Sequence, residues 1–316
     1  MSKKRIVIAG GNGFLGQALT KELLRRDFEV VVLTRSPRDE RDDEAIESEW
    51  DGEHVGEWIQ FLEGAEAIVN FAGRSINCRH TRKNIRELIA SRVDSVQAIA
   101  AGIHHTTRPP RLWLQASAVG FYGDRKDQWC DETTPGGQGS RAEVCRQWED
   151  AFNSVSVPKT RRILLRMGVV LGHEGGALPI LEHLTKWFLG GAAGNGRQFL
   201  SWIHLEDLMQ LFQHAMVHDN FLDGVYNAVA PNPVTNAQFM RELRHVLVRP
   251  WCPPAPGWAI KLISLLTQME SSLMLESCRC VPKRIVDTGF QFQFPELRGA
   301  LKNLYKPERH LQIGDG

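Results

Sequence analysis

The feature that most constrains the fold is a glycine-rich turn near the start of the chain. Residues 6–9 (IVIA) are apolar and rich in β-branched side chains, which predicts a short buried strand. Gly10, Gly13 and Gly16 follow, and residues 17–26 continue with helical periodicity. In such a strand–turn–helix unit the glycines permit a sharp turn, close approach of a phosphate to backbone N–H groups, and tight packing of helix on strand.

A helix that begins directly after such a turn presents free N–H groups and the positive end of its dipole. Both favour a pyrophosphate, so the turn predicts a dinucleotide-binding site. The residues expected to contact the cofactor here are Gly10, Asn12, Gly13, Phe14, Leu15 and Gly16.

The second expected strand, residues 29–34, indicates which dinucleotide is bound. An NAD-selective site carries an Asp or Glu at its end to accept the ribose hydroxyls. Here Thr34 and Arg35 stand at that position. A guanidinium and a hydroxyl can bind a 2′-phosphate, which a carboxylate would repel. We therefore predict NADP(H) in preference to NAD(H); the alternative is that Arg35 simply faces water.

Further apolar segments alternate with helical ones. Residues 67–73, 112–117 and 163–167 read as buried strands, whereas residues 81–104 and 140–153 read as helices, and the charged residues 39–53 as a surface loop. This alternation predicts an α/β fold with a Rossmann-type, doubly wound parallel sheet. Ligands collect at the carboxyl ends of such strands, so we add Asn70, Phe71, Ala72, Gly73, Ala116, Ser117 and Arg166 to the expected cofactor site.

From about residue 175 the alternation of strand and helix patterns becomes less regular, and prolines are frequent in the last third of the chain. We expect residues 1–174 to form the NADP-binding domain, with a later strand contributed from about 220–230. Residues 175–316 should form a smaller, mainly α, substrate-side lobe interleaved with the sheet, with helices near 236–248, 257–275 and 296–304.

Composition excludes several classes of function. The net charge of +1 offers no basis for electrostatic binding of nucleic acid or of an anionic membrane. Lys261, Gln268 and Glu270 interrupt the apolar stretch 258–275, so no membrane span is expected. No apolar signal segment precedes the first strand, and six cysteines without regular spacing suggest reduced thiols and a cytoplasmic protein. Cys278-x-Cys280 alone is too little for a metal site, and no metal is expected.

The chain resembles the extended short-chain dehydrogenase/reductases, and within them an atypical branch of "epimerase family" proteins that carry a C-terminal domain of unknown function. The matching segments include GGNGFLG (10–16), VNFAG (69–73), SAVGFYGD (117–124), LLRMGVVLG (164–172), GNGRQFLSWIH (194–204) and VPKR (281–284). The resemblance implies NADP contacts from the glycine turn, Thr34, Arg35, Phe71, Ala72, Glu87, Arg92 and Val170. It also implies a homodimer.

The catalytic pair of that superfamily is a Tyr followed four residues later by a Lys on one helix. Tyr122 and Lys126 have the spacing, but Gly123 and Asp124 favour a turn there. On the expected helix 140–153, alignment of Glu149 with the family's Glu places Arg141 at the Tyr position and Cys145 at the Lys position. Arginine cannot donate a proton near neutral pH, so the usual pair is absent.

Three substitutes stay open: Tyr122 together with Ser117, the Cys145 thiol, and the His204 imidazole. We take Ser117 and Tyr122 as the catalytic candidates. Two functions compete. One is an NADP-dependent oxidoreductase or epimerase acting on a small polar or sugar-like substrate that the sequence does not identify. The other is a non-catalytic NADP(H)-binding sensor or regulatory protein. A structural protein with a vestigial site is the weakest alternative.

Overall fold

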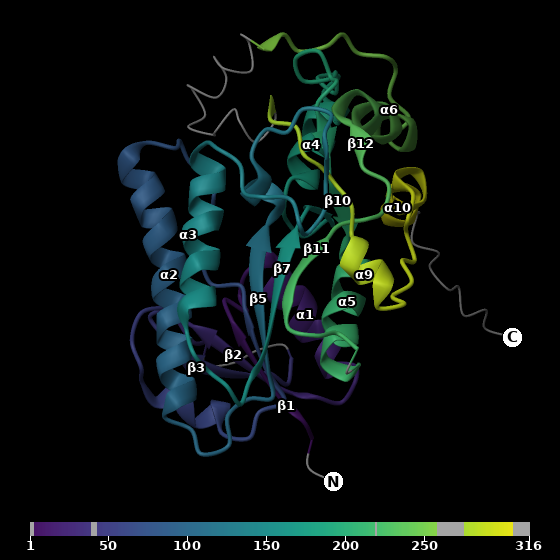
Figure 1. The fold of residues 1–316 in the computed structure, drawn as a ribbon. Helices are drawn as coiled ribbons and strands as arrows, with labels where there is room; N and C mark the ends of the chain where they lie inside the picture. The colour runs from purple at the N-terminus through teal and green to yellow at the C-terminus, as the bar shows by residue number, and fades with distance from the viewer. Residues whose placement is uncertain (1–2, 39–42, 219, 258–274, 306–316) are drawn as a thin grey trace, which may run out of the picture.

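In a computed structural model, which describes residues 3–38, 43–218, 220–257 and 275–305, the chain forms a parallel sheet with helices on both faces (Figure 1). Seven strands make the sheet: β1 (Arg5–Ala9), β2 (Glu29–Thr34), β3 (Ile46–Glu49), β4 (Ala67–Asn70), β5 (Leu112–Ala118), β7 (Arg161–Met167) and β11 (Gly224–Ala228). Their order is β11-β7-β5-β4-β1-β2-β3, and all pairs are parallel. The predicted doubly wound fold is confirmed, and the strand expected near 220–230 is β11.

The strand order reverses between β1 and β4. The chain runs outward from β1 through β2 to β3, returns to β4, and then runs outward through β5, β7 and β11. Ile6 lies opposite both Val30 of β2 and Ala67 of β4. In open α/β sheets a reversal of this kind leaves a crevice at the carboxyl ends of the strands, where ligands bind.

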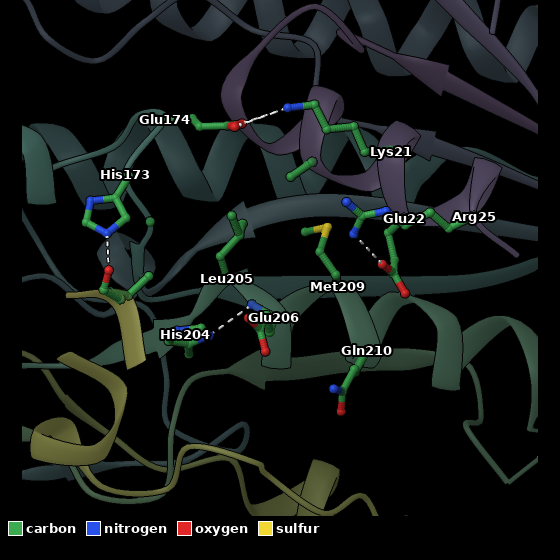
Figure 2. Close-up of a pocket in the computed structure, with 13 residues that line it drawn as sticks. Lys21, Glu22, Arg25, His173, Glu174, His204, Leu205, Glu206, Met209 and Gln210 are labelled. Carbon is green, nitrogen blue, oxygen red and sulfur yellow. Dashed lines mark hydrogen bonds and ion pairs between the residues drawn. The ribbon is translucent and has the colours of Figure 1, made fainter. Parts of the chain in front are cut away.

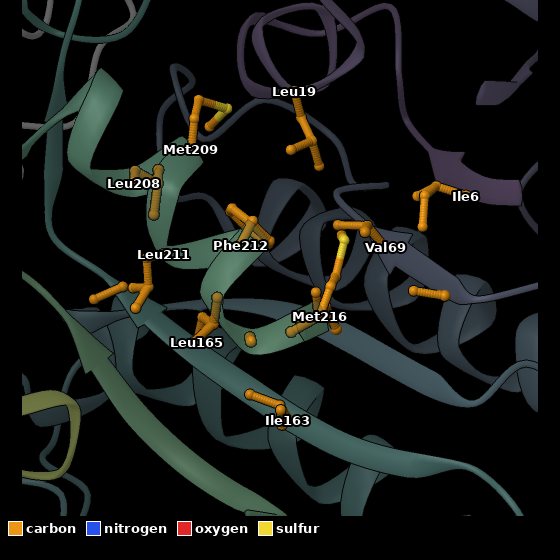
Figure 3. Packing of buried hydrophobic residues seen from close by; sticks show 14 of the residues in the cluster. Ile6, Leu19, Val69, Ile163, Leu165, Leu208, Met209, Leu211, Phe212 and Met216 are labelled. Carbon is orange, nitrogen blue, oxygen red and sulfur yellow. The ribbon is translucent and has the colours of Figure 1, made fainter. Parts of the chain in front are cut away.

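The two faces of the sheet bury alternate side chains. Ile6 and Ile8 pack with helices α1 (Phe14–Leu24) and α5 (Leu205–Val217), and this cluster is shown in Figure 3. Val7 and Ala9 pack on the other face, which α2 (Arg82–His104) and α3 (Ser140–Ser154) cover. Because both faces are covered by helices, the strands read in sequence as nearly continuous apolar runs.

One expectation about the sheet is wrong. Residues 39–53 were expected to be a surface loop, but Ile46–Glu49 form the edge strand β3, paired with β2. An edge strand has a partner on one side only and can carry charged residues, which also discourage pairing with another chain. The segment IESE therefore lacks the apolar run that marks the interior strands.

Much of the chain after β7 builds a smaller lobe, whereas α5 and β11 belong to the sheet domain. The elements of the lobe are β8 (Val169–Leu171) paired with β10 (Trp202–His204), β9 (Phe199–Leu200) paired with β12 (Val234–Thr235), and helices α4 (Leu178–Lys186), α6 (Asn236–Val246) and α10 (Leu297–Leu304). Helix α9 (Lys283–Asp287) instead packs on β11, and its Ile285 belongs to the core of the sheet. A separate apolar core, which includes Trp202, Phe239 and Leu301, holds the lobe together. The helix expected near 257–275 lies almost wholly outside the described residues.

Short elements complete the description: the 3-10 helices η1 (Glu57–Leu62) and η2 (Val119–Tyr122), and the two-residue strands β6 (Trp129–Cys130) and β13 (Arg279–Cys280), which pair in parallel. Among the described helices, none combines the length and the apolar character that crossing a membrane requires.

The packing of α5 on the sheet makes a stability prediction. Phe212 is fully buried and meets the Phe71 ring edge-on at 5.1 Å, whereas Val217 on the same helix is 68% exposed. We expect Phe212→Ala to lower the free energy of unfolding by about 3–5 kcal/mol, because it leaves a cavity. Val217→Ala, the matched control, should change it by less than about 0.5 kcal/mol. Urea denaturation of the two variants measures both values, and equal losses would contradict this packing.

Candidate functional site

The glycine turn brings the ends of β1 and β4 into contact. Gly10 has a φ of +75°, and a Cβ there would lie 2.9 Å from the Ala72 backbone nitrogen. A Cβ on Gly16 would lie 2.4 Å from the Gly11 Cα. Larger residues would therefore push the turn away from both β4 and α1, which explains why glycine is needed at these positions.

The start of α1 is arranged to receive an anion. Its N-cap, Gly13, has an extended backbone and provides no side-chain cap, and no acidic residue lies in the first turn. Phe14 anchors the turn from the other side, since its ring packs against Gly172 and Gly175. The first N–H groups of the helix, which lack intrahelical partners, thus face the crevice with the positive end of the dipole.

At the end of β2, side chains connect the glycine turn to the next loop. Asn12 Nδ2 donates to Thr34 Oγ1 at 2.9 Å, and Arg38 donates to Asn12 Oδ1 at 3.3 Å. Glu47 of β3 holds Arg38 through an ion pair of 3.0 Å. Arg35 is exposed beside this group. Two guanidinium groups and a hydroxyl therefore lie at the place where the second strand ends.

At the end of β4, Asn70 shapes the loop rather than pointing into the crevice. It is fully buried; its Nδ2 donates to Ser95 Oγ and Gln115 Oε1, each at 3.1 Å, and its Oδ1 accepts from the Ala72 N–H at 2.9 Å. These bonds use both amide hydrogens and engage the amide oxygen. Asn70 thus orients the Phe71–Gly73 backbone, and a cofactor would meet that backbone instead of the Asn70 side chain.

Arg92 projects from α2 toward the same loop. Its guanidinium is 8% exposed, donates to the Leu88 carbonyl at 2.9 Å, lies 4.9 Å from the Trp148 ring centre and packs against Gly73. Burial lowers the pKa of Arg92. Among the described residues no carboxylate forms an ion pair with it, and a buried charge without a counter-ion is costly. The site therefore fits an anionic ligand.

Glu87, one helical turn earlier on α2, forms ion pairs with Arg74 and Lys83 and is half-exposed. Val170 lies in β8 opposite Ile203, and Ala116 is buried in β5. The structure thus places the predicted cofactor residues along the carboxyl ends of β1, β2, β4, β5 and β7, on the adjoining turns of α1 and α2, and, for Val170, in β8.

Ser117 and Arg166 meet through Glu149. Ser117 Oγ donates to Glu149 Oε1 at 2.6 Å, and Arg166 donates to both Glu149 oxygens, the shortest bond being 2.7 Å. All three side chains are buried. They come from β5, β7 and α3, so this ion pair joins two strands to the helix that covers them.

Tyr122 extends this network. Its hydroxyl accepts from Arg166 Nη1 at 3.0 Å and donates toward Asn227 Oδ1 at 2.8 Å, with the Asp131 carbonyl also within reach. The ring is fully buried, and burial raises the pKa of the Tyr122 phenol. Neither hydroxyl, Ser117 or Tyr122, can reach a substrate here without breaking one of these bonds. A catalytic role for them remains a prediction that requires rearrangement.

Tyr122 and Lys126 do not form a helical pair. Tyr122 ends η2, Gly123 follows with a φ of +64°, and Lys126 itself has a φ of +55°. The expectation that this segment is not helical is confirmed.

Arg141 and Cys145 lie on one side of α3, facing the turn after β5. A Cβ built on Gly120 would lie 3.6 Å from Arg141 Nε and 3.5 Å from Cys145 Sγ. Arg141 forms an ion pair of 3.1 Å with Glu276. Cys145 is buried, and burial raises its pKa to about 11, so its thiol is a poor proton donor or acceptor near neutral pH.

His204 lies elsewhere, at the start of α5. Its Nδ1 accepts from the Glu206 N–H at 3.1 Å and so caps the helix, while Phe294 lies 4.0 Å from its ring. It borders a cavity of about 410 Å³ between α1 and α5, shown in Figure 2, which carries charges of both signs, including the Lys21–Glu174 ion pair of 3.1 Å. This cavity flanks the later turns of α1 and is separate from the glycine turn.

The sequence analysis did not predict three residues that hydrogen-bond or pair with the site residues described above: Asn227, Gln115 and Glu276. Asn227 and Gln115 are polar residues within buried strands, which is a usable signal because such residues need internal partners. Glu276 gives no such signal, since it meets Arg141 only through folding of a segment far along the chain.

The strand order, the glycine turn and the network around Ser117 define a protein of the extended short-chain dehydrogenase/reductase class. A model described as the NAD dependent epimerase/dehydratase family matches residues 6–144, and one for a domain of unknown function (DUF1731) matches residues 255–304.

Relatives that match nearly the whole chain support the same family. The chain is 33% identical to the epimerase family protein SDR39U1 homolog, chloroplastic, of Arabidopsis thaliana over 95% of this chain and 86% of that protein. It is also 33% identical to epimerase family protein YfhF of Bacillus subtilis, over 95% and 97%. The crystal structure of human epimerase family protein SDR39U1 (isoform 2) with NADPH superposes with a TM-score of 0.84 and 32% identity, covering 95% of this chain and 99% of that one. The chain belongs to this epimerase family.

The buried His204 makes stability depend on pH. Burial lowers its pKa to about 4, so the unfolded state binds the proton first as the pH falls below about 6.5. We expect the free energy of unfolding to fall by about 2 kcal/mol more in wild type than in His204→Asn between pH 7 and pH 5. Asparagine keeps the helix cap without a titratable group. Urea denaturation at each pH measures this difference, and parallel pH profiles would contradict the assignment.

Proposed function

We propose that the protein binds NADP(H) at the carboxyl ends of β1, β2 and β4. The observation that carries this proposal is the buried Arg92 guanidinium, which packs on Gly73 without a carboxylate partner among the described residues. A pyrophosphate between Arg92 and the start of α1 would supply the missing negative charge. The NADPH in the human relative's structure supports the same chemistry.

Preference for NADP(H) over NAD(H) is proposed from the residues at the end of β2. Arg35 is exposed there, and Arg38 is held by Glu47 and Asn12 at the position where a 2′-phosphate would lie. No carboxylate replaces Arg35 at the end of that strand, and the nearby Glu47 carboxylate is paired with Arg38, which offsets its repulsion of a phosphate.

A fluorescence titration with NADPH and NADH separates the contribution of the 2′-phosphate contacts from that of the pyrophosphate contacts. We expect Arg35→Ala to weaken NADPH binding about ten- to a hundred-fold and to leave NADH binding nearly unchanged, because only NADPH carries the 2′-phosphate. Arg92→Gln should weaken NADPH binding and NADH binding by a similar factor, since both dinucleotides carry the pyrophosphate.

Arg108→Ala is the matched control, because this exposed arginine pairs with Glu63 before β5, at the opposite end of the sheet. Thermal unfolding of each variant establishes that it is folded. Equal wild-type affinity for NADPH and NADH would overturn the NADP(H) preference, and unchanged affinities in Arg92→Gln would overturn the pyrophosphate site.

We further propose that the protein is an oxidoreductase or epimerase that acts on a small polar or sugar-like substrate. Family membership supports this, as does the smaller lobe that packs beside the carboxyl ends of the strands. The bound nicotinamide would supply hydride transfer. The chain's own residues would orient the cofactor, with Ser117 and Tyr122 as the hydroxyls nearest the end of β5.

A specific observation favours the second candidate, a non-catalytic NADP(H)-binding sensor or regulator. The Ser117 and Tyr122 hydroxyls are bonded to Glu149, Arg166 and Asn227, and the resemblance to the superfamily puts Arg141 and Cys145 at the positions of its Tyr and Lys. Such a protein would bind the cofactor and respond to its redox state without turnover.

Tyr122→Phe tests the role of the network. We expect the free energy of unfolding to fall by about 1–3 kcal/mol, because Arg166 and Asn227 each lose a buried partner, with NADPH affinity within about twofold of wild type. The rate of NADPH oxidation is screened over aldehydes, ketones and nucleotide sugars. For any substrate that wild type turns over, the rate of the variant should stay within about threefold of the wild-type rate.

Tyr226→Phe is the matched control, because this buried tyrosine bonds only a backbone carbonyl and an arginine far from Ser117. A fall in turnover of about a hundred-fold with unchanged stability would instead assign proton transfer to Tyr122. Tight NADPH binding by wild type with no turnover of any substrate would favour the sensor.

A further inference from the structure

Three of the six cysteines gather on one face of the small β6–β13 ladder. Cys280 lies directly opposite Cys130 in the parallel register, and Cys278 precedes Cys280 by two residues, so it points to the same side. The Sγ atoms of Cys278 and Cys280 are 3.1 Å apart, and both thiols are in hydrogen-bonding contact with Cys130. Cys130 and Cys280 are fully buried, whereas Cys278 is partly exposed.

The surroundings of this thiol cluster are apolar. Val119, Tyr122 and Val229 pack around it, and the Cys278 thiol donates to the Val119 carbonyl at 3.5 Å. Nowhere in the described parts of the chain are His, Cys, Asp or Glu side chains grouped so as to hold a metal ion. The cluster therefore consists of mutually bonded thiols beside the turn that follows Ser117.

The three thiols are not equivalent. Hydrogen bonds from Cys278 and Cys280, with the charge of Arg125 in addition, lower the pKa of Cys130. The bond with Cys130 raises the pKa of Cys278, and burial raises that of Cys280. Of the three residues, Cys278 alone is partly exposed, so it is the one that an oxidant can reach. Thiolates attack oxidised sulfur, whereas accessible thiols meet the oxidant first.

The backbone allows a bond between the strands. Opposite residues on neighbouring strands lie about 4.8 Å apart at Cα, within the range of about 4.4–6.8 Å that disulfides span. Residues two apart on one extended strand lie about 6.6 Å apart, at the limit of that range. Cross-strand pairing with Cys130 therefore demands less distortion than a bond between Cys278 and Cys280.

We propose that Cys130, Cys278 and Cys280 form an oxidisable thiol site, in which a peroxide produces a disulfide that joins Cys130 to Cys278 or Cys280. Peroxide oxidises Cys278, through its thiolate form, to a sulfenic acid and is itself reduced to water. Cys280, whose Sγ lies 3.1 Å away, then attacks the Cys278 sulfur, and the hydroxide that leaves takes up the proton of the Cys280 thiol to form a second water. Cys130 attacks the resulting Cys278–Cys280 disulfide and forms the cross-strand bond, and the sulfur that it displaces takes up the proton of the Cys130 thiol.

The disulfide would couple two distant parts of the chain. It would tie the segment 276–281, which carries the Arg141 partner Glu276, to the loop that follows Tyr122. It would also close a loop of about 150 residues, which strongly restricts the unfolded chain. This inference is independent of what the protein binds or catalyses.

The test uses the full-length reduced protein, treated with hydrogen peroxide while folded and then alkylated with N-ethylmaleimide in denaturant. Intact mass should show four alkylated thiols in place of six, restored to six by dithiothreitol. In Cys252→Ser, which removes a cysteine outside the cluster, peroxide should lower the number of alkylated thiols from five to three. Cys278→Ser and Cys280→Ser should each keep five alkylated thiols, and thermal unfolding of the reduced variants establishes that they are folded.

Trypsin maps the bond, because cleavage at Arg279 separates Cys278 from Cys280, and Cys130 lies on the peptide 127–141. A non-reduced digest should link peptide 127–141 to the peptide that ends at Arg279 or to the peptide 280–283. Retention of all six thiols, a bond only between Cys278 and Cys280, or loss of thiols only at Cys78, Cys145 or Cys252 would each overturn the proposal.

Discussion

The buried ion pair between Arg166 and Glu149 connects the parts of this molecule that form the site. Arg166 comes from β7 and Glu149 from α3, and their shortest contact is 2.7 Å. Burying two charges costs several kcal/mol of solvation each, and removal of one partner leaves the other charge uncompensated. Two further hydrogen bonds offset this solvation cost: Ser117 donates to Glu149, and Arg166 donates to Tyr122. Because these residues come from different elements, the ion pair fixes the relative positions of β5, β7 and α3.

A comparison of Arg92 with Arg166 separates architecture from binding. Both guanidinium groups are buried to a similar degree, and both lie near the carboxyl ends of the strands. Arg166 is neutralised from within by Glu149, whereas Arg92 bonds a single backbone carbonyl and stacks near Trp148. A charge that the protein itself neutralises belongs to the framework. The Arg92 charge has no carboxylate partner among the described residues, which is why the proposed cofactor site rests on Arg92 rather than on a hydroxyl of the network.

The carboxyl edge of the sheet combines a dinucleotide-type turn with an unusual helix face. The close approach of Gly10 to Ala72 and the uncapped start of α1 match what a dinucleotide requires. The side of α3 that faces the turn after β5 carries Arg141, paired with Glu276, and the buried thiol of Cys145. The segment from Glu276 to Cys280 thus contacts α3 through Glu276 and contributes Cys278 and Cys280 to the thiol cluster.

The sequence by itself determined the doubly wound sheet and the glycine turn, because periodicity and glycine spacing are local properties. It missed the edge strand β3, whose one-sided pairing needs no apolar run. Only the tertiary structure decided that Asn70 orients a loop, that Tyr122 is enclosed by Arg166 and Asn227, and that Cys130 meets Cys278 and Cys280. Those outcomes depend on which side chains from distant segments share a buried volume, and spacing along the chain does not contain that information.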